Sequence, residues 1–240
     1  MTAQRLRLLH TSDIHLDNRV GTEASPTAAE DGLSLVVERA NEMAVDLLLL
    51  AGDLFDHNRV KDPCFEFVDA TLSRLACPVV MITGNHDCMT DYSVYHRYHP
   101  EQIGDHVHFI RDEPGAKRSF DDLGLTIWGR GIVDHHPGHK PLEAVPDHDS
   151  DHWYVGMTHG YYVNRGAEMF SSLITPEEIA DSGLHYLALG HVHVFNIMNH
   201  GDTVAAYSGS PNLEQGVKER SAAYVELCPE NGVSVTQLLL

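Results

Sequence analysis

Short apolar runs alternate with amphipathic stretches along the first part of the chain. The runs at 6–9, 45–50 and 79–82 are almost continuously apolar, which is typical of strands buried on both faces of a sheet. Between them, apolar residues recur at helical spacing over 29–43. A second helix is expected to begin at the Asp-Pro pair at 62–63, with the aspartate as its cap. This strand–helix alternation predicts a parallel sheet with helical crossovers.

The second part of the chain favours strands over helices. Candidate strands lie at 107–110, 125–128, 153–157, 186–189, 203–207, 222–227 and 233–239. One short helix is expected after Thr175, because this side chain can cap it and Glu178 completes a capping box. The stretches 131–151 and 161–173 lack a periodic pattern and are interpreted as surface loops. With no repeat and no linker visible, we expect an α/β fold in one domain over residues 1–240.

Charge and cysteine content narrow the classes of function. The net charge is −19, from 16 Lys plus Arg against 35 Asp plus Glu, which argues against a broad basic face that binds nucleic acid unaided. A local basic groove, or a partner that supplies one, is compatible with this balance. The four cysteines form no Cys-x-x-Cys pair, and neither a secretory signal nor a membrane span is visible. We therefore expect a cytoplasmic protein that makes no membrane contact.

Side chains that bind metal ions follow the ends of the apolar runs. They are Asp13 and His15, Asp53 and Asp56, Asn85 and His86, His159, and His191 and His193. The carboxyl ends of strands meet at one edge of an open α/β sheet, so these residues are expected to converge. Carboxylate, amide oxygen and imidazole together suit Mn²⁺, Fe²⁺ or Zn²⁺, and the set is larger than one ion needs. The sequence therefore predicts a binuclear centre bridged by Asp53, in which two ions roughly 3.5–4 Å apart hold a shared hydroxide.

In order and type, these clusters resemble the signature of the calcineurin-like metallophosphoesterase superfamily over nearly the whole chain. The resemblance implies two divalent ions that share Asp53. Their remaining ligands would be Asp13, His15 and His193 for one ion, and Asn85, His159 and His191 for the other. His86 matches the general acid that protonates the leaving alkoxide, and Asp56 matches the carboxylate that orients this histidine. The implied fold is a four-layer α-β-β-α sandwich of two mixed sheets flanked by helices.

Four longer stretches resemble one branch of that superfamily, the DNA-repair exonucleases of the Mre11 and SbcD group. They are His-Thr-Ser-Asp-Ile-His-Leu-Asp at 10–17, Ala-Gly-Asp-Leu-Phe-Asp at 51–56, Ala-Leu-Gly-His-Val-His at 188–193 and Tyr-Ser-Gly-Ser-Pro at 207–211. The resemblance implies cleavage of DNA with Mn²⁺ and a coiled-coil ATPase partner. The chain ends 47 residues after His193, so the cap domain and the partner-binding segment of that branch are expected to be absent.

Three classes of function remain open from the sequence. The motifs of the nuclease branch favour a Mn²⁺-dependent phosphodiesterase that acts on DNA as an exonuclease or endonuclease. The compact and acidic chain favours the alternative, a phosphodiesterase or phosphatase for cyclic nucleotides or nucleotide derivatives. A non-catalytic scaffold is the third class, and it is disfavoured because every ligand and the catalytic histidine are present.

Other polar residues near the predicted centre have two interpretations each. The histidine-rich segments 134–139 and 147–152 are interpreted as solvated loops, with an extra metal site or a role in substrate selection as alternatives. Asp87 is expected to stabilise the turn after Asn85 rather than take part in the chemistry. The polar residues just after His159 can contact a phosphate or a base, or can be ordinary loop packing. These residues are Tyr161, Tyr162, Asn164 and Arg165.

Overall fold

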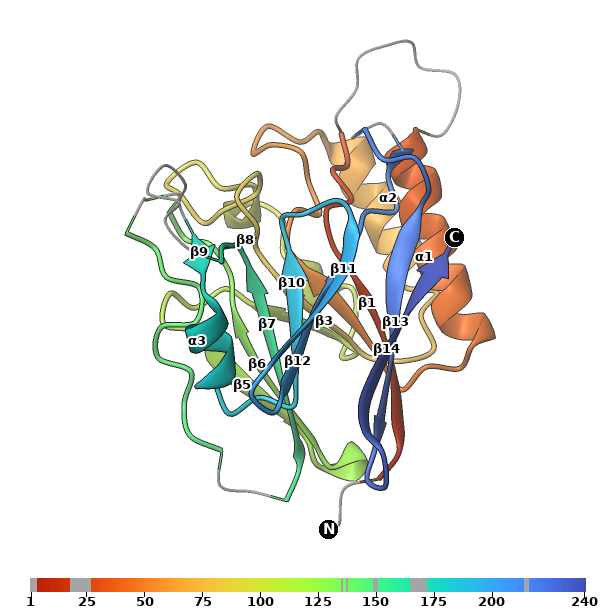
Figure 1. Cartoon of the computed structure of the whole chain (residues 1–240). Helices are drawn as coiled ribbons and strands as arrows, with labels where there is room; N and C mark the ends of the chain where they lie inside the picture. Colours follow the sequence, from red (N-terminus) through yellow and green to blue (C-terminus); the bar gives the residue numbers. More distant parts are fainter. Residues whose placement is uncertain are drawn as a thin grey trace.

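Two six-stranded mixed sheets lie face to face, with helices on the outer sides (Figure 1). The computed structural model describes residues 4–17, 27–134, 136, 138–148, 151–164, 172–213 and 216–240. The first sheet has the order β14 (Gly232–Leu239), β13 (Ser221–Cys228), β1 (Leu6–Thr11), β2 (Leu47–Ala51), β3 (Val79–Ile82) and β4 (Val107–Ile110). The second has the order β11 (Phe195–His200), β12 (Thr203–Ser208), β10 (Tyr186–Gly190), β7 (Trp153–His159), β6 (Leu125–Arg130) and β5 (Ala116–Phe120).

The first sheet is parallel except for an antiparallel hairpin at one edge, and the second sheet is parallel at its centre and antiparallel at both edges. β1, β2, β3 and β4 pair in parallel, as the strand–helix alternation predicts, and the hairpin of β13 and β14 extends this sheet in the antiparallel sense. In the second sheet, β12, β10, β7 and β6 are parallel, whereas β11 and β5 pair antiparallel at its two edges. A small parallel pair, β8 (Tyr161–Tyr162) and β9 (Leu173–Ile174), lies in a stretch interpreted from the sequence as a loop.

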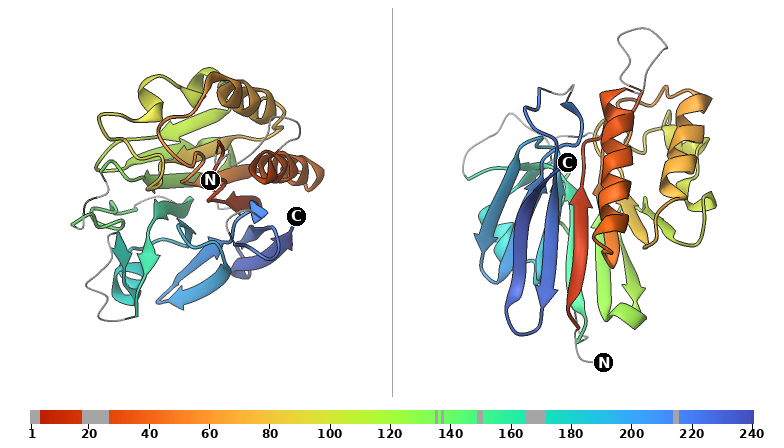
Figure 2. Two further views of the ribbon diagram at one scale, coloured as in Figure 1. Left: turned by 90° about the horizontal axis from the view of Figure 1, so that it is seen from above. Right: turned by 90° about the vertical axis from the view of Figure 1, so that its right-hand side faces the viewer.

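Continuously apolar strands are explained by the layers on both of their faces. Along β2, Leu48 and Leu50 pack toward the helices, while Leu47 and Leu49 pack toward the second sheet. The second sheet is covered on its outer face in the same way, by a cluster that includes Ile179 of the short helix α3. The four-layer arrangement implied by the resemblance is therefore confirmed, and Figure 2 shows the layers from above and from the side.

The helices are α1 (Ala28–Glu42), α2 (Asp62–Leu72) and α3 (Pro176–Ala180), and single 3₁₀ turns lie at Val94–His96, Pro100–Gln102 and Asp121–Leu123. The capping box predicted at Thr175 and Glu178 is confirmed. The cap predicted at Asp62 is wrong, because Lys61 occupies the N-cap position and its side chain makes no capping hydrogen bond. Asp62 lies instead in the first turn, where the helix dipole favours a negative charge.

Every strand predicted from apolar runs is present, whereas β5 and β11 were missed. Neither strand has a clear apolar pattern, because β5 reads Ala-Lys-Arg-Ser-Phe and β11, which begins two residues after His193, has asparagines at exposed positions. Both are edge strands, so one flank makes no ladder and the burial pattern is weak. Over the part of the chain that the structure describes, no helix has the length and apolarity needed to cross a bilayer.

Candidate metal centre

The carboxyl ends of five strands meet at one edge of the sandwich, the upper edge in Figure 1. β1, β2 and β3 come from the first sheet, and β7 and β10 come from the second. The structure brings all the predicted metal ligands to this edge: Asp13, His15, Asp53, Asn85, His191 and His193 follow strands, and His159 ends β7. The two sheets thus contribute to one site from opposite sides of their shared core.

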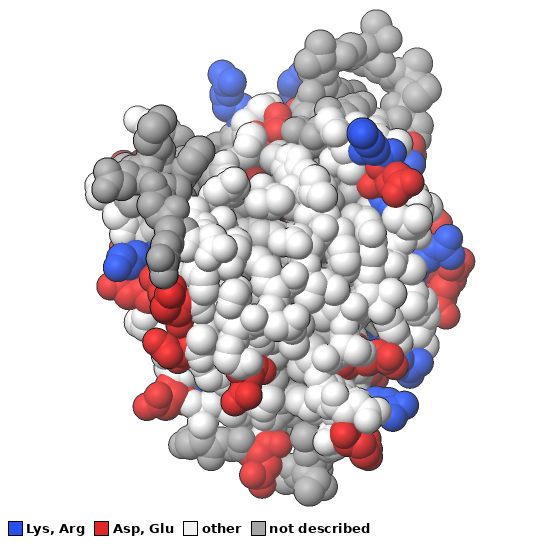
Figure 3. All heavy atoms as spheres, in the orientation of Figure 1, with Lys and Arg blue, Asp and Glu red and all other residues white. Residues whose placement is uncertain are grey.

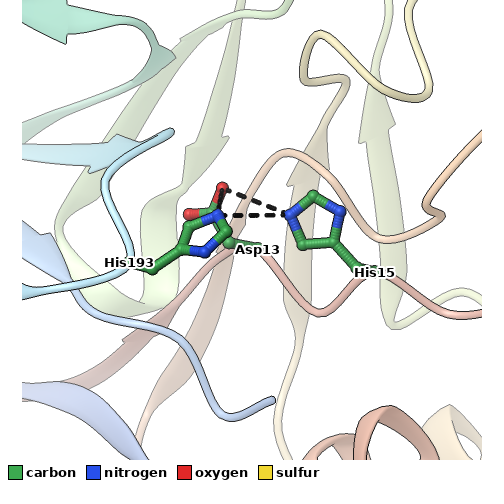
Figure 4. A group of neighbouring side chains, drawn as sticks. All are labelled: Asp13, His15 and His193. Carbon is green, nitrogen blue, oxygen red and sulfur yellow. Dashed lines mark hydrogen bonds and ion pairs between the residues drawn. The ribbon is translucent and has the colours of Figure 1, made fainter. Parts of the chain in front are cut away.

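The first ligand group combines one carboxylate and two imidazoles (Figure 4). His193 Nε2 lies 3.5 Å from Asp13 Oδ1 and 3.3 Å from His15 Nε2. His15 Nε2 in turn lies 3.9 Å from Asp13 Oδ1. Asp13 and His15 are buried, while the His193 side chain is 24% exposed. The three groups therefore converge on one point that is reached from the solvent past His193.

The second ligand group centres on the amide oxygen of Asn85. Its Oδ1 lies 3.0 Å from His159 Nε2 and 2.8 Å from His191 Nδ1. His159 Nδ1 donates a hydrogen bond to the carbonyl of Ala51 at 2.9 Å, which leaves Nε2 as the nitrogen that faces these oxygens. Electron pairs that converge in this way repel each other unless a proton or a cation lies between them. The donors of this group fit a divalent ion.

Asp53 lies between the two ligand groups. One of its carboxylate oxygens, Oδ2, lies 3.3 Å from His159 Nε2 and 3.8 Å from His15 Nε2. The other, Oδ1, accepts a hydrogen bond from the backbone N–H of His86 at 2.8 Å, which fixes the orientation of the carboxylate. A carboxylate that reaches both groups is suited to bridge two ions. The residues present therefore fit a binuclear centre with Asp53 at its middle.

Burial and charge together set the protonation of this site. Burial opposes the ionisation of Asp53, but the charge and hydrogen bond of His159 outweigh it and hold the pKa of Asp53 below its usual range. Burial also opposes protonation of His159, yet Asp53 raises the pKa of this imidazole to about 9. Burial and the charge of His159 lower the pKa of His191 to about 4. The lowered pKa of Asp53 and the raised pKa of His159 thus favour an ion pair between these two side chains.

Four of the predicted ligands have backbone in the left-handed region. The φ angles are 57° at Asp13, 54° at His15, 52° at Asp53 and 100° at His191. Residues other than glycine rarely adopt these angles, and they cluster at functional sites where the surrounding structure enforces them. Here the turn at the end of β1 is held against the turn at the end of β2 by backbone hydrogen bonds. The strand ends thus impose a strained backbone that aims the side chains inward.

Gly190, at the end of β10, allows the two sheets to approach closely beside the site. A Cβ atom built at this position would collide with the carbonyl oxygen of Ala51, and it would lie 2.5 Å from His159 Nδ1. The same contact region holds the hydrogen bond between His159 and Ala51. Glycine is therefore required here, because any side chain would push the two strand ends apart.

His86 and Asp56 lie at the edge of the ligand groups. His86 Nδ1 donates to the backbone carbonyl of Asp56 at 2.8 Å and lies 3.5 Å from its carboxylate. The carboxylate is closer to His15, with 3.0 Å between Asp56 Oδ1 and His15 Nδ1. Asp56 thus contacts both rings: its main chain orients His86 and its side chain orients His15. The catalytic roles suggested for His86 and Asp56 by the resemblance remain predictions.

A buried hydrogen-bond network supports Asp13, and the sequence patterns did not predict it. Ser12 Oγ donates to Asp13 Oδ2 at 2.5 Å, and Ser210 Oγ donates to the carbonyl of Asp13 at 2.7 Å. Asn212 Nδ2 donates to the carbonyl of Ile14 at 2.9 Å. The Tyr-Ser-Gly-Ser-Pro stretch at 207–211 was the signal for this network in the sequence. Its second serine, Ser210, and the nearby Asn212 stabilise the loop that carries Asp13.

The Asp87 carboxylate joins the loop that carries Asp53 to the loop that carries Asn85 by hydrogen bonds. Its Oδ1 accepts a hydrogen bond from the N–H of Gly84 at 2.7 Å. Its Oδ2 accepts from the N–H of Leu54 at 3.0 Å, the N–H of Phe55 at 3.3 Å and the hydroxyl of Tyr95 at 2.8 Å. Its side chain takes part in none of the ligand groups found among the described residues. This is the turn-stabilising role expected from the sequence.

Replacement of Asp87 by alanine is expected to destabilise the fold. Four buried donors would lose their acceptor, and unsatisfied buried groups cost about 1–3 kcal/mol each. The free energy of unfolding, measured by urea denaturation, should therefore fall by roughly 3–5 kcal/mol after relaxation around the site. Tyr95→Phe is the matched control, because it removes one donor and leaves the three backbone bonds. A loss in Asp87→Ala no larger than that in Tyr95→Phe would contradict this role.

The histidine-rich segments lie apart from the ligand groups. His136 and His139 line a cavity of about 330 Å³ together with Arg130. His148 stacks on Tyr154, with ring centroids 4.3 Å apart. Over the described ranges, the side-chain groups able to hold a metal ion all lie at the strand-end centre. The sequence interpretations also named His135, Pro137, Asp149, Ser150 and Arg165, which lie outside the described residues.

Curated relatives include a DNA double-strand break repair protein and a nuclease subunit. The DNA double-strand break repair protein Mre11 of Methanopyrus kandleri is 26% identical over 226 residues, covering 86% of this chain and 49% of the relative. The SbcD component of the nuclease SbcCD of Bacillus subtilis is 24% identical over 275 residues, covering 98% of this chain and 70% of the relative. The chain thus spans about half the length of the archaeal relative.

Solved structures and a family model complete the comparison. A dimetal phosphatase from Danio rerio superposes with a TM-score of 0.60 at 12% identity, covering 98% of both chains. A protein from Thermus thermophilus gives 0.60 at 13% identity, covering 96% of this chain and 98% of the other. These likenesses show the fold. The model described as calcineurin-like phosphoesterase matches residues 6–195. The chain therefore belongs to the calcineurin-like phosphoesterase family and is a hydrolase.

Proposed function

We propose that this protein is a binuclear, Mn²⁺-dependent phosphodiesterase of the nuclease type, with DNA as its substrate. The observation that carries this proposal is the position of Asp53, whose Oδ2 lies within 3.8 Å of a histidine nitrogen in each ligand group. The likeness to Mre11 and to the SbcD component of SbcCD supports a nucleic-acid substrate. Residues 1–240 would form one catalytic domain. The four free and buried cysteines suit a reducing compartment such as the cytoplasm.

In the proposed mechanism, the two ions and the protein have different roles. Asp13, His15 and His193 would hold one ion and Asn85, His159 and His191 the other, with Asp53 shared. When bound, such ions lower the pKa of water and neutralise charge on the phosphate during in-line attack. The protein fixes their positions, because Asp53 is oriented by the His86 N–H and the Asp13 loop is held by Ser210.

His86 is suited to deliver a proton to the leaving oxygen. Its side chain is 41% exposed, so a substrate can reach it, whereas the adjoining His15 is buried. The Nδ1–H group is bonded to the carbonyl of Asp56, which leaves Nε2 as the atom that exchanges a proton with the substrate. Proton transfer matters most where an alkoxide leaves, as in a phosphodiester of DNA.

The charge of the chain favours a second candidate, a small nucleotide phosphodiesterase. On the face shown in Figure 3, a broad central area carries neither acidic nor basic side chains, and side chains of both signs lie around its margin. This area lies over edge strands such as β11 and β14, which contain no Asp, Glu, Lys or Arg. This face therefore offers no broad basic surface for a duplex. Binding of long DNA would rest on a local groove or on a coiled-coil ATPase partner.

Hydrolysis assays separate the two candidates. We expect EDTA to abolish hydrolysis of bis(p-nitrophenyl) phosphate and Mn²⁺ to restore it, because the ions supply the attacking group. Labelled single- and double-stranded DNA are assayed beside that diester, with Asp53→Ala as the contamination control. Cleavage of DNA by the wild type alone supports a nuclease. Cleavage restricted to the nitrophenyl diester indicates that the substrate is a small phosphodiester. No metal-dependent hydrolysis of any of them would contradict the proposal.

A further inference from the structure

An exposed aromatic ring stands beside the metal centre. Tyr161 lies two residues after His159, and this residue is 38% exposed. Its ring centroid is 6.1 Å from that of His191, and the two planes meet at 89°. This distance and angle are those of a T-shaped aromatic pair. The Tyr161 ring is thus both in contact with a predicted metal ligand and accessible to the solvent.

The backbone around Tyr161 is held rigidly. The N–H of Tyr161 donates to the carbonyl of Ser172 at 2.9 Å, and the N–H of Tyr162 donates to the hydroxyl of Tyr207 at 2.8 Å. The same hydroxyl donates to the carbonyl of Gly160 at 2.8 Å. Tyr207 thereby fixes the chain on both sides of Tyr161. The ring is consequently presented from a fixed backbone, which lowers the entropy lost when a ligand binds to it.

Packing against His191 does not explain the exposed position of the Tyr161 ring. His191 is held independently, since its N–H donates to the Asp13 carboxylate at 3.0 Å and its Nδ1 faces Asn85 Oδ1 at 2.8 Å. A tyrosine that served only to pack this imidazole would gain from being buried, whereas Tyr161 remains partly exposed. An accessible, rigid aromatic ring beside a phosphate-hydrolysing centre is suited to stack on a planar group of the substrate.

We infer that Tyr161 forms a stacking subsite for the nucleobase attached to the scissile phosphate. This inference rests on the proposed phosphodiesterase function, and it adds that the substrate carries a base next to the reacting group. The base can belong to a DNA strand or to a mononucleotide diester, because both present the same aromatic face. Stacking on a tyrosine tolerates any base, so no sequence preference is expected from this contact.

Two chromogenic diesters with the same leaving group test the inference. Thymidine 5′-(p-nitrophenyl) phosphate carries a base, and methyl p-nitrophenyl phosphate does not. In Tyr161→Ala with Mn²⁺, kcat/KM for the thymidine ester should fall roughly 5- to 150-fold relative to that for the methyl ester. Tyr161→Phe is the matched variant, because it keeps the ring and should retain the wild-type ratio. An equal loss on both esters would show that the ring only supports His191, and would overturn the inference.

Binding measurements keep this test separate from the test of the activity. Calorimetry with thymidine 5′-monophosphate and with inorganic phosphate is performed on the Mn²⁺-supplemented protein. Tyr161→Ala should weaken binding of the nucleotide and leave binding of phosphate unchanged, even if neither ester is hydrolysed. Equal affinity of wild type and variant for the nucleotide would overturn the inference.

A short oligonucleotide and the same oligonucleotide with an abasic residue at the cleaved position then separate the two sources of the base. Loss of activity in Tyr161→Ala confined to the base-bearing oligonucleotide assigns the subsite to DNA, and loss confined to the mononucleotide ester assigns it to small diesters.

Discussion

Asp53→Ala is expected to lose both metal ions and nearly all hydrolytic activity. The carboxylate reaches both ligand groups, with 3.3 Å to His159 Nε2 and 3.8 Å to His15 Nε2, so its removal takes one ligand from each ion. Without the ions the reaction loses several kcal/mol of charge stabilisation, which corresponds to a rate reduction of roughly 10³-fold or more. Metal content is measured by atomic absorption after dialysis, beside the rate on bis(p-nitrophenyl) phosphate.

A second aspartate provides the control for this experiment. Asp46 accepts a hydrogen bond from the N–H of Arg7 at 2.7 Å, at the end of β1 and β2 away from the metal centre. Asp46→Ala removes a carboxylate of the same kind and should keep both ions and the wild-type rate. Two ions retained by Asp53→Ala would exclude Asp53 as the bridge, whatever the effect on activity.

His86→Gln is expected to retain both ions and to lose activity selectively on substrates with poor leaving groups. Donation of a proton by a positioned side chain contributes about 10²–10⁴-fold where the leaving group needs it. An alkoxide leaving from a dinucleotide needs that proton, whereas nitrophenolate leaves readily without one. We therefore expect a fall of roughly 10²-fold or more on a dinucleotide and a small change on a nitrophenyl diester.

The ratio of the two losses decides the role of His86. Its backbone N–H holds Asp53 at 2.8 Å, and a substitution of the side chain keeps that bond. Metal content should consequently match the wild type. Equal losses on the dinucleotide and the nitrophenyl diester would indicate that His86 acts through the position of the ions rather than as an acid. Asp56→Asn tests the neighbouring carboxylate in the same assay, because it keeps the carbonyl that accepts from His86 Nδ1.

The parallel core and the gathering of ligands could be predicted because both depend on local sequence patterns. The run Leu47–Ala51 is apolar throughout and Asp53 follows it after Gly52, so the strand and the predicted ligand at its end are visible together. The same holds for Asn85 after β3. Edge strands such as β5 could not be found in this way, since their charged and exposed residues give no apolar period.

The supporting contacts could not be predicted because they join residues far apart in the chain. Ser210 lies 197 residues from Asp13, and Asn212 lies 198 residues from Ile14. Such pairs depend on how β12 and β1 are placed across the sandwich, which no local pattern encodes. The same limit applies to Asp56. From its position three residues after Asp53, Asp56 was expected to orient His86. The fold places its carboxylate closer to His15 than to His86.

The left-handed backbone at four predicted ligand positions sets the stability of the fold against the proposed function. At φ angles between 52° and 100°, a side chain costs about 1–2 kcal/mol that glycine would avoid, yet glycine cannot bind a metal ion. A relative freed from catalysis would therefore gain stability by acquiring glycine at the positions of Asp13, His15, Asp53 or His191. We therefore expect glycine at these positions to be commoner in members of the fold that have lost catalysis than in active hydrolases.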